Sequence, residues 1–174
     1  MMESMVSFIQ ERIKKRKYNI GIDFTMGNGH DTLFLSDYCH HVYSYDIQQT
    51  AIENTKRLVK NKNNISLFLK SHELFDEDID NFDVGIFNLG YLPGGNQEII
   101  THYQVTLKTI KKALHYLNKK GSVYIVVYIG HDNGKESHYL NEYFQTLDHK
   151  LYNVAKFEMM NKRNAPYTVI LEKR

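Results

Sequence analysis

The sequence has few of the features that cross-link, interrupt or anchor a chain. Cys39 is the only cysteine among 174 residues, which excludes an internal disulfide and fits a reducing, cytoplasmic setting. Two prolines and no low-complexity segment argue against a linker, so we expect residues 1–174 to form a single domain. No apolar run is long enough to span a bilayer. Residues 1–17 predict a helix packed on this domain rather than a signal peptide.

The histidines and the net charge also argue against two kinds of site. Nine histidines occur, but none has the H-E-x-x-H spacing and none is grouped with cysteine, so we expect no metal site. The net charge of +2 does not by itself indicate a nucleic-acid-binding protein, although basic residues are locally clustered.

What the sequence does contain is a regular alternation of apolar patterns. Apolar residues three and four apart predict helices, and short β-branched or aromatic runs predict strands. The expected helices cover residues 1–17, 30–36, 48–61, 100–117 and 134–147, and the expected strands cover 18–24, 41–47, 65–69, 82–89, 121–129, 152–160 and 166–173.

This order of elements predicts a doubly wound α/β sheet. The last two strands are joined by residues 161–165 alone, too few for a crossover helix, which predicts an antiparallel hairpin. A seven-stranded, mostly parallel sheet with such a hairpin and helices on both faces resembles the Rossmann-like fold of class I methyltransferases, which use S-adenosylmethionine (SAM). A dinucleotide-binding domain usually lacks the terminal hairpin.

The segment IDFTMGNGHDT, residues 22–32, joins the first predicted strand of this alternation to a helix. Gly27 and Gly29 permit positive φ and close approach of a ligand to the backbone. The dinucleotide fingerprint G-x-G-x-x-G is incomplete, because Thr32 occupies the third glycine position. The glycine pair alone is equally compatible with a purely structural turn.

Three acidic residues bear on the choice of cofactor: Asp46 suits SAM and a dinucleotide alike, because both carry an adenosine ribose, whereas Asp23 favours SAM. Asp46 ends the second predicted strand of the sheet, where a carboxylate can accept hydrogen bonds from both ribose hydroxyls of an adenosine. Asp23, at the end of the first of these strands, suits a cationic sulfonium and amino-acid tail but would repel a pyrophosphate. Asp31 either adds to this preference or serves as a first-turn helix charge.

A second informative segment, FNLGYLPGGN, follows the strand predicted at 82–89. Asn88, Tyr91 and Pro93 loosely match the N-P-P-Y motif of methyltransferases that modify amino groups. A simple Gly/Pro-rich turn would explain the proline and glycines, but not an aromatic and an amide at the mouth of the crevice. His131, after the strand predicted at 121–129, is either a loop hydrogen-bonding residue or a substrate contact.

With YDIQ, YIGHDNGKES and NKRNAPYTVILEK, these segments resemble a compact family of bacterial methyltransferases. The family has been labelled “putative rRNA methylase” and is associated with methylation of the 5-aminomethyl group of wobble (2-thio)uridine in tRNA. The resemblance implies SAM as cofactor and the tRNA anticodon loop as partner. It implies a cofactor site formed by Asp23, Thr25, Gly27, Asn28, Gly29, Asp46, Gln48, Ser71, His72 and Asn88. Thr25 departs from many methyltransferases, which have the first glycine of the loop there.

On this interpretation, Asn88, Tyr91 and His131 are the candidate catalytic residues. Asn88 would orient the amine, and Tyr91, His131 or water would accept its proton. The candidate substrate-binding residues are Tyr91, Pro93, His131, Lys162 and Arg163, the last two in the hairpin connection. A homodimer is compatible with the sequence. Two alternatives stay open: an rRNA or small-molecule amine methyltransferase of the same fold, and a non-enzymatic nucleotide-binding module.

Overall fold

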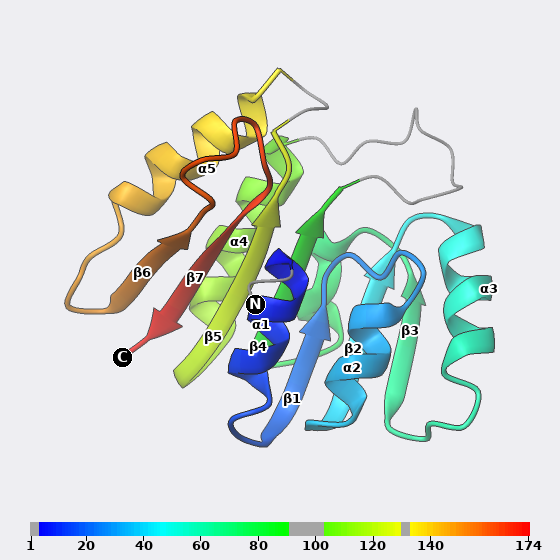
Figure 1. Ribbon diagram of the computed structural model, residues 1–174. Helices are drawn as coiled ribbons and strands as arrows, with labels where there is room; N and C mark the ends of the chain where they lie inside the picture. Colours follow the sequence, from blue (N-terminus) through cyan, green and yellow to red (C-terminus); the bar gives the residue numbers. More distant parts are fainter. Residues whose placement is uncertain (1–3, 91–102, 130–132) are drawn as a thin grey trace.

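The computed structural model describes residues 4–90, 103–129 and 133–174, and its centre is one twisted sheet (Figure 1). The sheet has seven strands in the order β3-β2-β1-β4-β5-β7-β6. Strand β7 runs antiparallel to both β5 and β6, and the neighbouring pairs from β3 to β5 are parallel. The strands are β1 Tyr18–Asp23, β2 Cys39–Asp46, β3 Ile65–Leu69, β4 Phe82–Leu89, β5 Leu117–Val127, β6 Tyr152–Phe157 and β7 Tyr167–Lys173. The predicted fold class is confirmed, including the C-terminal antiparallel hairpin.

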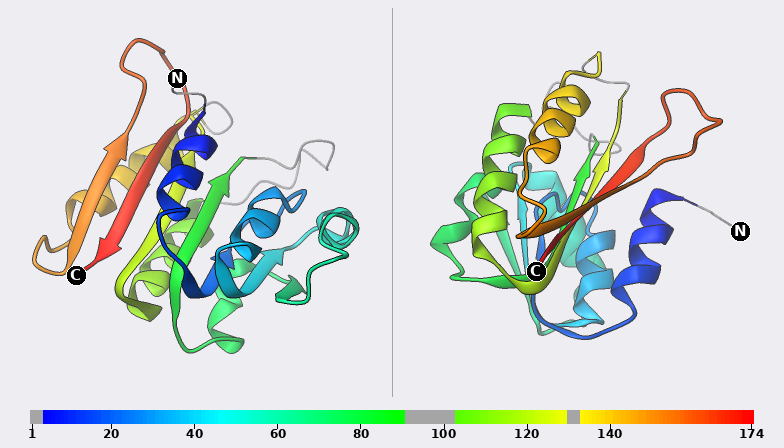
Figure 2. Two further views of the ribbon diagram at one scale, coloured as in Figure 1. Left: turned by 60° about the horizontal axis from the view of Figure 1, so that its bottom comes forward. Right: turned by 90° about the vertical axis from the view of Figure 1, so that its left-hand side faces the viewer.

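Helices cover both faces of the sheet, as Figures 1 and 2 show. They are α1 Met5–Ile13, α2 His30–Ser36, α3 Gln49–Leu58, the 3₁₀ helix η1 His72–Glu77, α4 Tyr103–Tyr116 and α5 Lys135–Gln145. One core lies under α4 and α5, where Ile110 and Leu140 meet the apolar side chains of the central strands. The other lies under α1 and α2, with Ile9 and Leu35 at its centre.

Helix α1 shows how periodicity is converted into packing. Its stripe of Met5, Ile9 and Ile13 is buried against the face formed by β5 and β7. Ser4 caps its N-terminus by accepting a hydrogen bond from the backbone N–H of Ser7 at 3.0 Å. The helix ends at Ile13, earlier than the predicted residue 17, and the basic residues that follow lead into β1.

The predicted boundaries also differ from the structure at the junction of α4 and β5, where the strand begins at Leu117 rather than at the predicted residue 121. We expected a helix over residues 100–117, but α4 ends at Tyr116 and Leu117 begins β5, where it pairs with Phe82. The α4 carbonyls of Leu114 and His115 accept hydrogen bonds from the ammonium of Lys173 at 3.2 and 3.1 Å. A side chain distant in sequence therefore caps the end of the helix. Ile100 lies outside the described residues.

The sequence also gave no signal for η1, which begins directly after Ser71 and carries the buried ring of Phe75. Strand β6 ends at Phe157 rather than at the predicted residue 160. Its pairing with β7 stops there, and the chain continues into the connection between the two strands.

Candidate cofactor and methyl-transfer site

The carboxyl ends of β1, β2 and β4 bring the predicted site residues together. Strand β1 pairs with β2 on one side and β4 on the other, so the strand order reverses there. Ligands of open α/β sheets bind in the crevice at such a switch point. The turn after β1, Asp46 at the end of β2 and Asn88 near the end of β4 all face this crevice by topology.

The glycine turn is held in a conformation that other residues would strain. Gly27 and Gly29 have φ of 52° and 83°, in the left-handed region. A Cβ at Gly29 would lie 2.6 Å from Oγ1 of Thr55, a residue of α3. The same Oγ1 donates to the carbonyl of Gly27 at 3.3 Å, so α3 clamps the turn. The structure thus requires glycine at residue 29, for conformation and for packing.

Asp46 links this turn to the start of α3. Its Oδ2 accepts from the backbone N–H of Gly27 at 3.0 Å, and its Oδ1 accepts from that of Gln48 at 2.9 Å. Each carboxylate oxygen has a second acceptor site, so two hydroxyls can still be bound after these contacts are made. The half-buried carboxylate is therefore fixed in place and chemically suited to the two hydroxyls of a ribose.

Asp23 lies beneath the turn and is fully buried. Its Oδ1 accepts from the N–H of Thr25 at 3.1 Å, and its Oδ2 accepts from Oγ1 of Thr32 at 2.6 Å. Burial, together with the nearby negative charge of Asp31, raises the pKa of Asp23 to about 7, although the two hydrogen bonds oppose the shift. A cation bound above this carboxylate would restore its ionised form.

Asn88 lies on β4, which pairs with β1 on the side away from Asp46 and β2, and its amide is held there by hydrogen bonds. Its Nδ2 donates to Oδ2 of Asp31 at 3.4 Å, and its backbone N–H donates to Oγ1 of Thr25 at 2.7 Å. Burial raises the pKa of Asp31, and the hydrogen bond from Asn88 partly offsets that effect. Thr25, unusual in this loop, therefore connects the turn after β1 to the end of β4. The amide oxygen of Asn88 is then the atom that can accept a hydrogen bond from an incoming amine.

Two other side chains join this network without having been predicted. Thr32 also shares a hydrogen bond of 2.7 Å with Oγ of Ser44, a buried residue of β2. Thr32 occupies the position at which the dinucleotide fingerprint has glycine. This departure from the pattern could have identified Thr32 as a residue of the site. Ser44 carried no comparable signal, because its role depends on the pairing of β1 with β2.

The remaining predicted cofactor residues are placed less directly. Asn28 accepts a hydrogen bond from Nδ2 of Asn54 at 3.0 Å, and Ser71 caps η1 by accepting from the N–H of Glu73. His72 is buried, with Nδ1 at 2.9 Å from Oγ1 of Thr109, and burial lowers its pKa to about 4. The ring of His72 therefore belongs to the core under α4, so a cofactor contact at this residue, as the family resemblance implies, would use its backbone.

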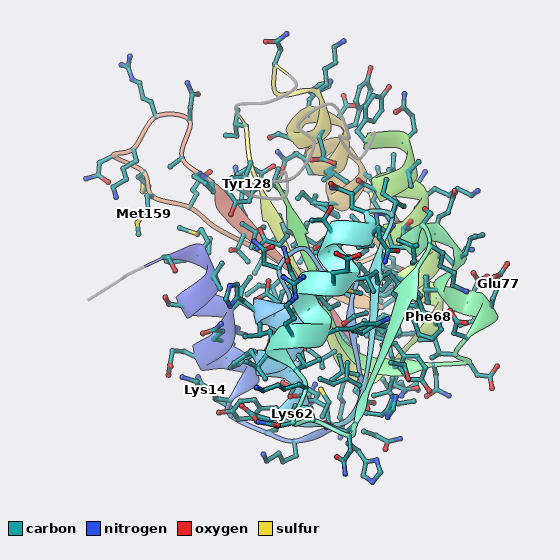
Figure 3. The ribbon with its side chains drawn as sticks, turned by 90° about the vertical axis from the view of Figure 1, so that its right-hand side faces the viewer. Lys14, Lys62, Phe68, Glu77, Tyr128 and Met159 are labelled. Atoms are coloured by element: carbon teal, nitrogen blue, oxygen red, sulfur yellow. The ribbon has the colours of Figure 1, made fainter. Side chains whose placement is uncertain are left out.

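The acceptor side of the site is only partly described. Tyr91, Pro93 and His131 lie outside the described residues, so their predicted roles stay predictions. Tyr128, labelled at the carboxyl end of the sheet in Figure 3, is half-buried, and burial and the charge of Asp31 raise its pKa. A Cβ at Gly90 would lie 3.5 Å from its ring.

Lys162 and Arg163 are exposed in the connection between β6 and β7. No cluster of metal-binding side chains occurs among the described residues, and in that part of the chain no helix has the length and apolarity needed to cross a membrane.

Comparison with solved structures defines the class of the fold as that of methyltransferases. A “putative rRNA-methylase” from Clostridium thermocellum superposes with a TM-score of 0.95 at 30% identity, over 100% of both chains. A “putative methyltransferase” from Streptococcus mutans, solved in complex with SAH (S-adenosylhomocysteine), gives 0.91 at 32% identity, also over 100% of both chains.

Sequence comparison then identifies the family. Residues 42–173 match the family described as “Putative rRNA methylase”, and the chain belongs to this family. A chloroplastic “tRNA (mnm(5)s(2)U34)-methyltransferase” of Arabidopsis thaliana is 39% identical over 171 residues, an alignment that covers 88% of this chain. The chain spans 62% of that relative's length. The family resemblance drawn from the motifs is confirmed.

Proposed function

We propose that this chain is a SAM-dependent tRNA methyltransferase that N-methylates the 5-aminomethyl group of wobble (2-thio)uridine. The name of the Arabidopsis relative, the SAH bound to the Streptococcus protein and the shared family support the proposal. The observation that carries it is the tethered amide of Asn88, held by Asp31 beside the switch point of the sheet. An amide fixed in this way can orient an amine nucleophile.

The residues present fit a cationic adenosine cofactor. Asp46 can bind the ribose hydroxyls, and Gly27 and Gly29 let the cofactor approach the backbone. Asp23, whose pKa is raised to about 7, gains from a positive charge placed nearby because the cation stabilises its ionised form. The N-terminus of α2 carries Asp31, and this negative charge disfavours a pyrophosphate in the same place.

The chemistry needs positioning more than activation. SAM supplies an activated methyl group: the amine nitrogen attacks the methyl carbon, the carbon–sulfur bond breaks, and SAH leaves with the bonding electrons. The chain's own task is to hold a neutral amine with its lone pair in line. The amide oxygen of Asn88 would accept one N–H, and the proton lost on methylation would pass to Tyr91, His131 or water.

The nature of the acceptor is argued from charge. Lys162 and Arg163 are exposed on the hairpin connection and suit phosphate contacts near the site. Half-buried Tyr128 lies at the mouth, where an aromatic ring can stack on a base taken out of an RNA loop. These features favour RNA over a small free amine.

A direct assay tests the proposal. Purified protein should convert 5-aminomethyl(-2-thio)uridine in undermodified tRNA to its methylaminomethyl form, measured by mass spectrometry of tRNA nucleosides. Ribosomal RNA and free amines serve as matched acceptors. Methylation of rRNA but not tRNA would overturn the wobble-uridine assignment. Binding of NADH but not SAM in isothermal titration would overturn the methyltransferase assignment itself.

A further inference from the structure

A second surface feature lies at the opposite end of the sheet from the candidate site. A groove of about 440 Å³ opens between the end of α1, the start of β5 and the ends of the β6–β7 hairpin. Six cationic side chains but only one carboxylate, Glu172, line it. The six are Arg12, Lys15, Arg16, Lys120, Lys173 and Arg174, and we refer to this feature as the basic groove.

Two of the six cations are half-buried and have their main partners within the protein. Arg12 pairs with Glu172 at 3.3 Å, and the ammonium of Lys173 donates to the carbonyl of Leu117 at 2.7 Å and to two carbonyls at the end of α4. The other four, Lys15, Arg16, Lys120 and Arg174, are exposed. Among the described residues of the groove, no acidic side chain other than Glu172 balances them. Like charges lining one hollow concentrate a positive potential there.

Some of these cations are held in place by neutral partners. The guanidinium of Arg16 donates to the carbonyl of Lys120 and lies 4.7 Å from the ring centre of Tyr18. Nε of Arg174 donates to Oδ1 of Asn153 at 3.0 Å. Each arrangement orients a guanidinium but leaves its charge and further N–H groups unused. Guanidinium groups fixed in this way suit the oxygens of phosphate.

The basic groove and the candidate site are connected by one strand. Ser122 lines the groove and Tyr128 stands at the mouth of the site, so at about 3.3 Å per residue they are roughly 20 Å apart along β5. Figure 3 shows the hairpin connection, marked by Met159, and the end of α1, marked by Lys14, on the same side of the molecule. An extended polyanion engaged at Lys162 and Arg163 can therefore follow this side to the groove.

We propose that the basic groove binds the sugar–phosphate backbone of the tRNA outside the anticodon stem–loop, while the loop occupies the candidate site. This inference rests on the proposed function for the choice of polyanion. A protein partner fits less well, because charged residues are depleted at the core of protein–protein interfaces, and six cations line this groove. The groove would thus let the enzyme select a whole tRNA over an isolated loop with the same target base.

The test removes the charge without disturbing the backbone. Lys120 has φ of 64°, a conformation that asparagine tolerates better than alanine, so the groove variant is Lys15→Gln, Arg16→Gln and Lys120→Asn. A control variant, Lys56→Gln, Arg57→Gln and Lys60→Gln, makes the same change of charge at exposed residues in and after α3, away from the groove (Figure 1). Circular dichroism melting checks that both fold like the wild type.

The readout is the dissociation constant for full-length tRNA and for an isolated anticodon stem–loop, measured by fluorescence anisotropy over a salt series. We expect the groove variant to bind full-length tRNA about tenfold more weakly, with the slope of log K against log salt reduced by about two. The dissociation constants of both variants for the stem–loop should stay within twofold of the wild-type value. The control variant should also match the wild type in its dissociation constant for full-length tRNA.

Equal affinities of the groove and control variants for full-length tRNA would overturn the inference. Sedimentation velocity separates the rival occupant: a groove variant that dissociates into monomers while binding tRNA normally would assign the groove to a contact between two copies. Failure of the proposed function can be distinguished from failure of the groove inference. In that case the wild-type protein would not methylate tRNA, whether or not it binds it. A groove variant that methylates and binds full-length tRNA like wild type refutes only the groove.

Discussion

The two ends of the sheet differ in the kind of ionisable side chain that they carry. At the carboxyl ends of the strands, Asp23, Asp31 and Asp46 surround the glycine turn, and burial raises the pKa of the first two, which favours their neutral forms. At the other end, the basic groove has one carboxylate among six cations. The same strands connect both ends, so the fold does not dictate this separation. On the functions proposed above, one edge would take a small cation and the other the backbone of a polyanion.

The largest expected effect comes from removing the hydrogen-bonded amide of Asn88 at the carboxyl ends of the strands. We predict that Asn88→Ala lowers kcat by about 10²–10³, because the amine loses an orienting partner that acts during methyl transfer. The dissociation constant for SAM should stay within twofold, and the backbone bond from residue 88 to Thr25 is independent of the side chain. Single-turnover assays and isothermal titration measure the two quantities. An exposed control, Asn61→Ala, should match wild type. A parallel loss of SAM affinity would instead place Asn88 on the cofactor side.

Removing the carboxylate at β2 should act on the cofactor. Asp46→Ala is expected to weaken SAM binding by about 1–3 kcal/mol, since charge-assisted hydrogen bonds to the ribose are lost. The fold should persist, because the residue ends a strand. Isothermal titration gives the affinity, and Asp80→Ala, an exposed carboxylate outside the helices and strands, is the control. Wild-type affinity in a folded Asp46→Ala protein would refute the ribose contact.

Changing the pH should change the affinity for SAM through the buried carboxyl group of Asp23. Because the pKa of Asp23 is raised to about 7, it is largely protonated at pH 5.5 and half ionised at pH 7. Cationic SAM prefers the ionised form, so its affinity should rise about tenfold over this range. Isothermal titration at intermediate pH values would show the rise. Asp23→Asn should give a flat profile, and a rise that persists in this variant would assign the titration to another group.

The connection between β6 and β7 would contact the tRNA between the candidate site and the basic groove. Lys162→Ala with Arg163→Ala should raise KM for tRNA several-fold and reduce the salt slope by about one to two, because phosphate contacts release counterions. SAM affinity should barely change. Steady-state kinetics at two salt concentrations measure this, with Lys56→Ala and Arg57→Ala as the charge-matched control. An unchanged KM and slope would mean that tRNA passes this loop without contact.

How much of this the sequence could predict depended on the distance between interacting residues. The step from β1 through the glycine turn to α2 was predictable, because glycine conformation and helix periodicity are local. The end of α4 was not, since its apolar spacing continues to Leu117 while Lys173 caps its carbonyls. The bond between Asn88 and Asp31 joins residues from different strand–helix units. The basic groove likewise exists only after α1, β5 and β7 converge.

The strand order also bears on how the protein is synthesised. Strand β7 follows β5 and β6 in the chain but lies between them in the sheet, so each of these has an unpaired edge until residues 167–173 are synthesised. The exposed edge of β5 would be an apolar run, including Val123, Ile125 and Val127. Unpaired apolar edges promote aggregation. A nascent chain stalled before Tyr167 should therefore need a chaperone, whereas addition of β7 covers both edges in one step.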